Sequence, residues 1–216
     1  MARVTALEPH ARRPDRYSVF VDGAFVAEVS APTARAMGLE EGGEATAADV
    51  AAVTAAAEVE LALSRACRYL RHRPRSRREV ERRLGRYGHP DDVAAAVLGL
   101  LAERRLVDDA AFAAAWVRDR LALKPKGRAA LRAELAACGV AAGDIEGALA
   151  AHFPAAEEEE VALAQRAAEP RLARLQARGG TAARAALYSF LYRRGFGPGV
   201  IRRVVAAAFP PAAAGG

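Results

Sequence analysis

The sequence predicts a mostly α-helical protein, built from three tandem three-helix repeats that follow a small N-terminal β-hairpin or sheet. Two observations predict the helices. Alanine, the best helix former, supplies 56 of the 216 residues, and apolar residues keep a helical spacing between regular glycine and proline breaks as far as Phe209. An alternating apolar pattern near the N-terminus predicts the strands. Alanine-rich units bury little area alone, so we expect them to stack in a row.

Strands are expected within residues 3–29. Tyr17, Val19 and Val21 alternate with polar neighbours, although the phenylalanine between the two valines interrupts the pattern. Asp22-Gly23 follows at once, and this dipeptide is the strongest short signal for a two-residue hairpin, because its turn needs positive φ at both residues. The sequence therefore predicts a hairpin that turns at Asp22-Gly23.

A third strand is predicted over residues 4–7, joined to the hairpin through a turn at Pro14-Asp15. Ser30 is placed to cap a short helix that ends near Gly38. A sheet of this size is only marginally stable alone and must pack against another element. Residues 1–45 are therefore expected to form a β-rich leader with one short helix.

Capping residues and breaks predict the helices that follow. Thr46 and Asp49 open a long helix that runs to about His72, and Ser76 and Glu79 have the spacing of a capping box. Further helices are expected over 109–123 and 157–178, and a pair resembling a helix-turn-helix over 76–87 and 91–104, with Pro170 and other prolines and glycines as breaks. The predicted boundaries are 46–107, 108–155 and 156–209 for the repeats and 210–216 for a flexible tail.

One spacing of two apolar residues and a glycine, each four apart, occurs three times. In each copy the apolar side chains face one side of a helix, and the glycine stands where a helix end requires a left-handed conformation. One copy is common in any helix that ends with glycine, but three copies with a similar apolar pair downstream favour a duplication. The copies are Val80/Leu84/Gly88 with Val93/Val97, Leu131/Leu135/Gly139 with Ile145/Leu149, and Leu187/Leu191/Gly195 with Ile201/Val205.

Positive charge is concentrated in the predicted repeats. The net charge of +6 divides into −5 over residues 1–60 and +11 over 61–216, and 30 of the 32 basic residues are arginines. A GC-rich genome would also enrich arginine, and an ordinary solvated helix surface is the alternative explanation for the charged blocks. Arginines beside helix N-termini suit phosphate or carboxylate, so the sequence predicts contacts with a polyanion. The candidate contacts are Arg71, Arg73, Arg75, Arg77, Arg78, Arg82, Arg120, Lys124, Lys126, Arg128, Arg193 and Arg194.

Nearby aromatic and acidic residues each have two interpretations. Tyr69 and Tyr87 could stack on bases, whereas Trp116 lies four residues after Phe112 and is expected in the core. Acidic residues at helix starts are expected to cap them, although they could also meet basic protein surface. These acids are Asp91, Asp92, Asp108 and Asp109, and with Glu103 they are the carboxylate cluster that a metal-dependent nuclease would need.

Catalytic and membrane signals are missing from the sequence. It has no GxxxxGK[ST] or GxSxG motif, and its four histidines lack metal-ligand spacing, so we expect no enzyme activity, cofactor or metal. No charge-free apolar run approaches 20 residues and the first residues do not predict a signal peptide, so we expect no membrane span. Cys67 and Cys138 are isolated, which is typical of a reducing cytoplasm.

Five segments share their order and spacing with one known family. They are RYSVFVDGAF at 16–25, ALSRACRYLRHRPRSRREVERRL at 62–84, LVDDAAFAAAWVRDR at 106–120, KPKGRAALRAEL at 124–135 and LYSFLYRRGF at 187–196. In these segments the chain resembles the bacterial RecX family, regulators of the RecA recombinase, and the resemblance covers about residues 4–209.

The resemblance implies a mostly helical protein of tandem three-helix repeats in an elongated, curved array, which is not an enzyme. It implies binding to RecA and to RecA filaments on single-stranded DNA, in the filament groove, with mainly inhibitory effects on filament extension, ATP hydrolysis and strand exchange. It further implies a cytoplasmic protein that acts in homologous recombination, DNA repair and the SOS response. We expect this protein to be a monomer and to bind single-stranded DNA and also double-stranded DNA. The alternative is a helical DNA-binding protein or transcriptional regulator, although Asp91 and Asp92 at the start of its recognition helix would repel phosphate.

Overall fold

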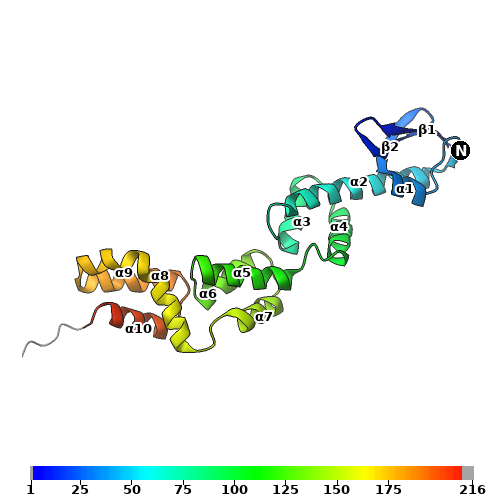
Figure 1. Ribbon diagram of the computed structural model, residues 1–216. Helices are drawn as coiled ribbons and strands as arrows, with labels where there is room; N and C mark the ends of the chain where they lie inside the picture. The colour runs from blue at the N-terminus through cyan, green and yellow to red at the C-terminus, as the bar shows by residue number, and fades with distance from the viewer. Residues whose placement is uncertain (1, 211–216) are drawn as a thin grey trace, which may run out of the picture. The chain divides into compact units, whose positions relative to one another are not determined.

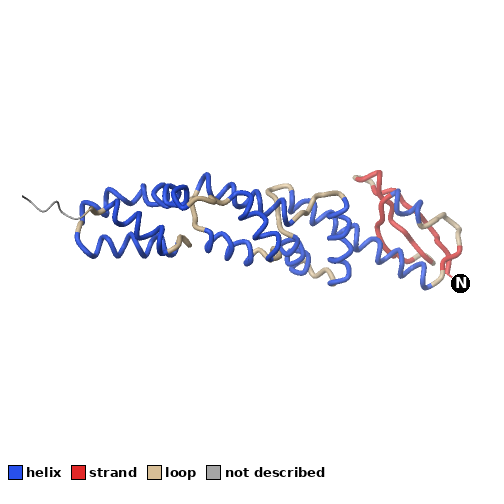
Figure 2. The backbone as a smooth tube through the Cα atoms, turned by 90° about the horizontal axis from the view of Figure 1, so that it is seen from below, coloured by secondary structure: helices blue, strands red, loops and turns tan. Residues whose placement is uncertain are grey.

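The computed structural model describes residues 2–210 and confirms the predicted fold class, mostly helical with a small N-terminal sheet (Figures 1 and 2). The predicted tail lies, apart from Pro210, outside the described residues. The strands are β1 (Ala2–His10), β2 (Arg13–Val21), β3 (Ala24–Ser30) and β4 (Glu44–Ala45). The helices are α1 (Ala31–Ala36), α2 (Ala47–Leu70), α3 (Arg77–Arg86), α4 (Asp91–Glu103), α5 (Asp109–Leu123), α6 (Arg128–Ala137), α7 (Ala142–His152), α8 (Glu157–Arg178), α9 (Gly180–Arg193) and α10 (Pro198–Ala208).

The leader is an antiparallel sheet in the order β3-β2-β1-β4, and it confirms the hairpin at Asp22-Gly23, whose residues both have positive φ. The predicted turn at Pro14-Asp15 is wrong. The chain turns at residues 11–12, and β2 already includes Pro14, which a strand tolerates near its first residue. Strand β4 pairs with Ala2 and Arg3 and was not predicted, because two residues are too few to show an alternating pattern.

One carboxylate fastens the leader to α2. Glu60 accepts hydrogen bonds from the hydroxyl and amide of Ser30, at 2.6 and 2.9 Å, and from the hydroxyl of Thr33, and it pairs with Arg16 at 3.0 Å. Burial alone would raise the pKa of Glu60, but the hydrogen bonds from Ser30 and Thr33 and the charge of Arg16 outweigh it and lower that pKa. The same Ser30 caps α1, as predicted.

The predicted helix starts are confirmed in detail. Thr46 and Asp49 form the capping box of α2, and in the box before α3 the Glu79 amide donates to Ser76 Oγ at 3.2 Å while the Ser76 amide donates to Glu79 Oε2 at 3.1 Å. Helix α8 passes through Pro170, so this proline is not a break. A proline inside a helix usually costs stability, but apolar residues of α8 on both sides of Pro170, from Val161 to Leu175, pack in the apolar cluster of the second unit.

The three-copy spacing marks the core and the helix ends as predicted. The six apolar residues of the motif are fully buried, and its glycines Gly88, Gly139 and Gly195 have φ between +81° and +83°. The downstream pairs are buried except Val205, which is half-buried. The buried face of α10 passes through Val200, Ile201 and Val204, so Val205 lies at its edge.

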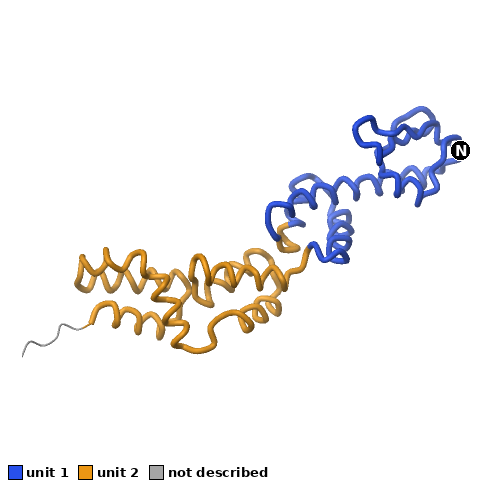
Figure 3. The backbone as a smooth tube through the Cα atoms, viewed as in Figure 1, with its two compact units in different colours: residues 1–74, 80–106 blue, residues 75–79, 107–216 orange. Residues whose placement is uncertain are grey.

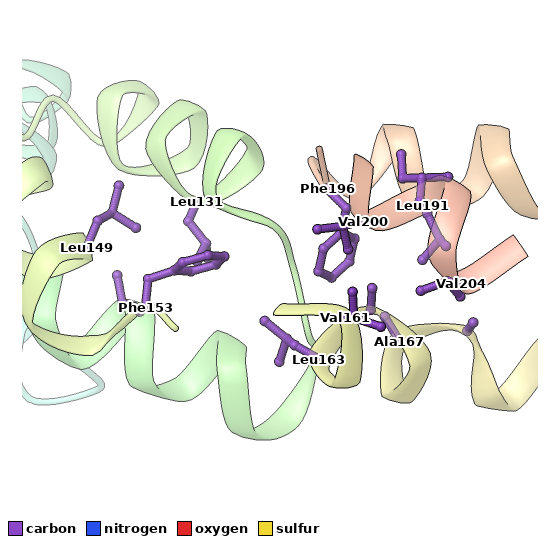
Figure 4. Close-up of a cluster of buried hydrophobic side chains, with 14 of the residues drawn as sticks. Leu131, Leu149, Phe153, Val161, Leu163, Ala167, Leu191, Phe196, Val200 and Val204 are labelled. Atoms are coloured by element: carbon purple, nitrogen blue, oxygen red, sulfur yellow. The ribbon is translucent and has the colours of Figure 1, made fainter. Parts of the chain in front are cut away.

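Two compact units divide the described chain, and each is described by itself (Figure 3). The first unit comprises residues 1–74 and 80–106, where α2 packs against both β3 and α4. The second comprises 75–79 and 107–216, where one continuous apolar cluster joins α5–α7 to α8–α10. Figure 4 shows side chains of this cluster, including Phe153 from the end of α7 and Val200 from α10.

Candidate polyanion-binding surface

The ends of two helices in the second unit meet backbone to backbone. The Gly127 amide donates to the Arg194 carbonyl at 2.8 Å, the Ala129 amide to the Gly195 carbonyl at 3.3 Å, and Arg194 Nη1 to the Pro125 carbonyl at 3.0 Å. A Cβ atom on Gly127 would lie 2.1 Å from the Gly195 oxygen, so only glycine permits this approach. The joint places the basic residues before α6 beside those that end α9.

A cavity of about 440 Å³ opens beside this joint, and five of its six lining residues are basic. Four of the predicted contacts meet here, from two segments that are far apart in the sequence. The lining residues are Lys124, Lys126, Arg171, Phe190, Arg193 and Arg194. We call this cavity the basic groove.

A second cavity, of about 300 Å³, extends the basic groove along α8 and α9 and shares Arg171, Phe190 and Arg193 with it. It adds Arg174 and Arg178, which the sequence did not single out as contacts. Arg171, Arg174 and Arg178 follow an i, i+3, i+7 spacing, so they share one face of α8. That spacing was the signal that could have found them.

The lining of the basic groove carries charge of one sign, although one lining residue, Lys126, also pairs with Glu134, which does not line the groove. None of the described residues that line either cavity is acidic. Buried Phe190 provides an aromatic face, over which the guanidinium groups of Arg171 and Arg194 lie at 4.5 and 5.1 Å. Burial, followed by the charges of Arg120, Arg194 and Lys124, lowers the pKa of Lys126. A phosphate bound here would relieve the mutual repulsion of these cations.

Two other predicted contacts of the second unit have acidic partners. Arg120 Nε donates to Glu134 at 3.1 Å, and its guanidinium lies 4.1 Å from the centre of the Trp116 ring. Arg128 pairs with Glu146 at 3.6 Å. Neither arginine lines the basic groove.

The basic residues around the start of α3 are divided between the two units. In the second unit, Arg75 pairs with Glu79 at 3.6 Å, the Arg77 amide donates to Asp109 at 2.7 Å, and the Arg78 side chain lies against Gly139. The first unit holds the remaining three, of which Arg73 donates to the Pro74 carbonyl and the other two are exposed. These three are Arg71, Arg73 and Arg82.

The aromatic residues make contacts within the protein. Trp116 packs on the core 5.6 Å from Phe112 and donates to Glu134 at 3.0 Å, which confirms its expected place. Arg83 lies over the rings of both Tyr69 and Tyr87, at 5.4 and 4.7 Å. Base stacking by these tyrosines stays a prediction.

The acids at helix starts have different roles. Asp108 accepts from the Ala111 amide at 2.9 Å and caps α5, as predicted. Asp91 and Asp92 lie inside the first turn of α4, whose cap residue is Pro90, so the prediction that they cap it is wrong and their stabilisation is limited to the helix dipole. Among residues 2–210, no three potential metal-ligating side chains are grouped as a metal site requires, and no helix is long and apolar enough to cross a membrane.

Comparison of the sequence with models of protein families shows to which family the chain belongs. Three models match successive parts of the chain: the first three-helix domain of RecX at residues 62–101, the second at 108–149 and the third at 157–205. Together they cover more than half of the chain. The chain belongs to the RecX family.

Individual RecX proteins support this membership. The "Regulatory protein RecX" of Mycolicibacterium vanbaalenii is 51% identical over 83 residues, which are 38% of this chain and 45% of that protein. The "Regulatory protein RecX" of Halalkalibacterium halodurans is 33% identical over 153 residues, 69% of this chain and 58% of that protein. The alignments thus span about half of these relatives. The crystal structure of a regulatory protein RecX shares the fold with a TM-score of 0.78 at 24% identity, over 94% of this chain and 98% of that one.

Proposed function

We propose that this protein binds RecA and RecA filaments on single-stranded DNA in the cytoplasm and mainly inhibits filament extension, ATP hydrolysis and strand exchange. It acts by binding, without catalysis, as a regulator in recombinational DNA repair and the SOS response. Membership of a family of regulatory proteins supports the regulatory role. The basic groove supports a nucleoprotein partner, since it combines clustered cations with an aromatic face.

The observation that carries the proposal is the convergence of two separate basic segments on one groove. Lys124 and Lys126 come from the segment between α5 and α6, whereas Arg193 and Arg194 come from the end of α9. Arginine binds phosphate oxygens in a planar, two-pronged geometry, and each neutralised phosphate of a single strand contributes about −0.7 to the slope of log K against log salt. A run of cations beside Phe190 therefore fits a phosphate backbone better than a neutral protein surface.

The decisive experiment adds the protein in substoichiometric amounts to RecA on single-stranded DNA. We expect the rates of ATP hydrolysis and strand exchange to fall, because one bound regulator blocks the addition of many RecA subunits to a filament or destabilises the filament. Unchanged rates at every ratio would refute the proposal.

A matched pair of variants assigns the effect to the basic groove. Arg193→Glu reverses an exposed charge that lines the groove, and Arg202→Glu reverses an exposed charge on α10 that does not. We expect Arg193→Glu to weaken inhibition and to reduce the salt slope of filament binding by about 0.7 or more, and Arg202→Glu to behave like the unmodified protein. Equal losses in both variants would mean that net charge alone drives binding.

The α3–α4 pair favours a second candidate, a DNA-binding transcriptional regulator. These helices have the order of a helix-turn-helix, with Gly88 at the turn. Two aspartates occupy the first turn of α4, the end that would approach phosphate. Tight binding to one duplex sequence, without any effect on RecA, would favour this second function.

A further inference from the structure

One carboxylate stands at the edge of the basic groove and holds three donors at once. Glu134, on α6, accepts from Trp116 Nε1 at 3.0 Å, from Arg120 Nε at 3.1 Å and from Lys126 Nζ. Lys126 lines the groove, whereas Arg120 and Trp116, both on α5, do not. The arrangement resembles the set of donors that a phosphate oxygen would receive.

This carboxylate is only partly shielded from water. The side chain of Glu134 is 24% exposed, and that of Lys126 is 26% exposed. An ion pair at this depth contributes modestly to stability, and solvent can reach it when it opens. The contact is therefore weak enough for an incoming anion to exchange with it.

The fixed and the exchangeable contacts of Glu134 differ in chemistry. Trp116 packs on the apolar core and its indole N–H is held in place. Lys126 has a flexible four-carbon stem and lies at the end of a non-helical segment, so its ammonium can turn from Glu134 into the groove. Glu134 keeps two donors when it releases Lys126.

We propose that Glu134 is an internal anion that competes with a phosphate of the bound strand for Lys126 and so limits the affinity of the basic groove. In the free protein Lys126 is paired with Glu134, and in the complex it contacts phosphate. The inference rests on the proposed nucleic-acid partner. It predicts that removing the carboxylate charge tightens binding, the opposite of what a purely supporting residue would do.

The test measures binding of a fluorescent thymidine homopolymer to the full chain, without RecA, across a range of salt concentrations. Glu134→Gln keeps an oxygen that can accept from Trp116 but removes the competing charge. We expect binding about threefold to fivefold tighter, the size of a partly exposed ion pair, and a salt slope steeper by about 0.7. Glu134→Ala serves as the second variant, and thermal unfolding confirms that each variant is folded.

The chain offers a matched control. Glu146, on the neighbouring helix α7, pairs with Arg132 at 2.6 Å and with Arg128, and none of the three lines the groove. Glu146→Gln makes the same change in net charge and should leave affinity nearly unchanged. An equal gain in affinity in both variants would mean that net charge, and not local competition for Lys126, controls binding. This result would overturn the inference.

A double variant identifies the contested residue. Lys126→Ala should weaken binding by itself, and it should abolish the gain when combined with Glu134→Gln. If Lys126→Ala leaves affinity unchanged, the groove is not the binding site and the inference fails, while inhibition of RecA can still be measured independently. If Lys126→Ala weakens binding but Glu134→Gln does not tighten it, Glu134 only positions Lys126 and the competition is refuted.

Discussion

Two helix starts in the second unit occupy equivalent repeat positions, yet they are joined to their neighbours by different atoms. Before α3, buried Ser76 donates its hydroxyl to the Cys138 carbonyl at 2.6 Å. Before α6, 51 residues later, Gly127 has no side chain and donates its amide to the Arg194 carbonyl. In both cases the start of one helix lies on the carbonyl end of the equivalent helix in the next group, so the repeat conserves the joint while changing the donor.

The charged residues beside these two joints differ accordingly. Arg75 precedes Ser76 and pairs with Glu79 in the first turn of α3, and its side chain is 15% exposed. Lys126 occupies the equivalent place before Gly127 and lines the basic groove. At the Gly127–Arg194 contact, the close approach of the backbones brings two basic segments together. At the Ser76–Cys138 contact, the second segment has no basic residue between positions 136 and 140. Equivalent sequence positions therefore need not have equivalent functions.

The substitution with the largest expected effect on this comparison is Gly127→Ala. Its Cβ would overlap backbone atoms, the Gly195 oxygen and the Phe196 nitrogen, so no change of rotamer relieves the contact. We expect the free energy of unfolding to fall by about 3 kcal/mol, and binding to the basic groove to weaken because Lys126 and Arg194 move apart. Chemical denaturation followed by circular dichroism measures the first effect.

A helical glycine of the same unit provides the control for that substitution. Gly147, in α7, is exposed, and a Cβ on it would meet nothing within 4 Å. Gly147→Ala should stabilise the protein by up to about 1 kcal/mol, because alanine is the better helix former. Similar stability changes for Gly127→Ala and Gly147→Ala would show that the close approach at the joint is unimportant.

Substitutions of Ser76 should lower the free energy of unfolding less than Gly127→Ala does. Ser76→Ala removes both the cap of α3 and the hydrogen bond to Cys138, and we expect a loss of about 1–2 kcal/mol in the free energy of unfolding. Ser76→Gly reproduces the residue of the other joint and should cost less, since glycine is a tolerated cap. Equal losses in the two variants would assign the whole effect to the hydrogen bonds of the hydroxyl and none to the preference of glycine for the cap position.

Local signals explain what the sequence predicted well. Asp22-Gly23, the capping boxes and the glycine ends of the helices depend on residues within four positions of each other, and all are present in the structure. The turn at residues 11–12 has no such signal, and Pro14 pointed to the wrong place. The two residues of β4 form a strand by pairing with Ala2 and Arg3 of β1, a contact that has no local signal in the sequence.

The candidate site needed three-dimensional information. The sequence identified Lys124, Lys126, Arg193 and Arg194, but not that they meet. Their meeting depends on backbone hydrogen bonds from Gly127 to Arg194 and from Ala129 to Gly195, which are 67 and 66 positions apart. It also did not show which cations have acidic partners: Arg120 and Lys126 both pair with Glu134, and Arg128 pairs with Glu146. Charge counts along a chain cannot distinguish paired from open arginines.

The smallest expected effects come from single truncations in the two basic segments. Lys124→Ala removes an exposed groove residue, and we expect the salt slope of oligonucleotide binding to shrink by about 0.7 with little change in stability. Arg75→Ala removes an i, i+4 ion pair with Glu79, and we expect a loss of about 0.3–0.5 kcal/mol in stability with a smaller change in slope.

Fluorescence anisotropy across salt concentrations and chemical denaturation measure both quantities on each variant. The reverse pattern, in which Arg75→Ala reduces the slope and Lys124→Ala reduces stability, would contradict the division between a structural and an open basic segment. Its confirmation would mean that two copies of one ancestral position have diverged. Arg75 pairs with Glu79, four residues on, whereas the residue four after Lys126 is Ala130, and Lys126 pairs instead with Glu134 beside the groove.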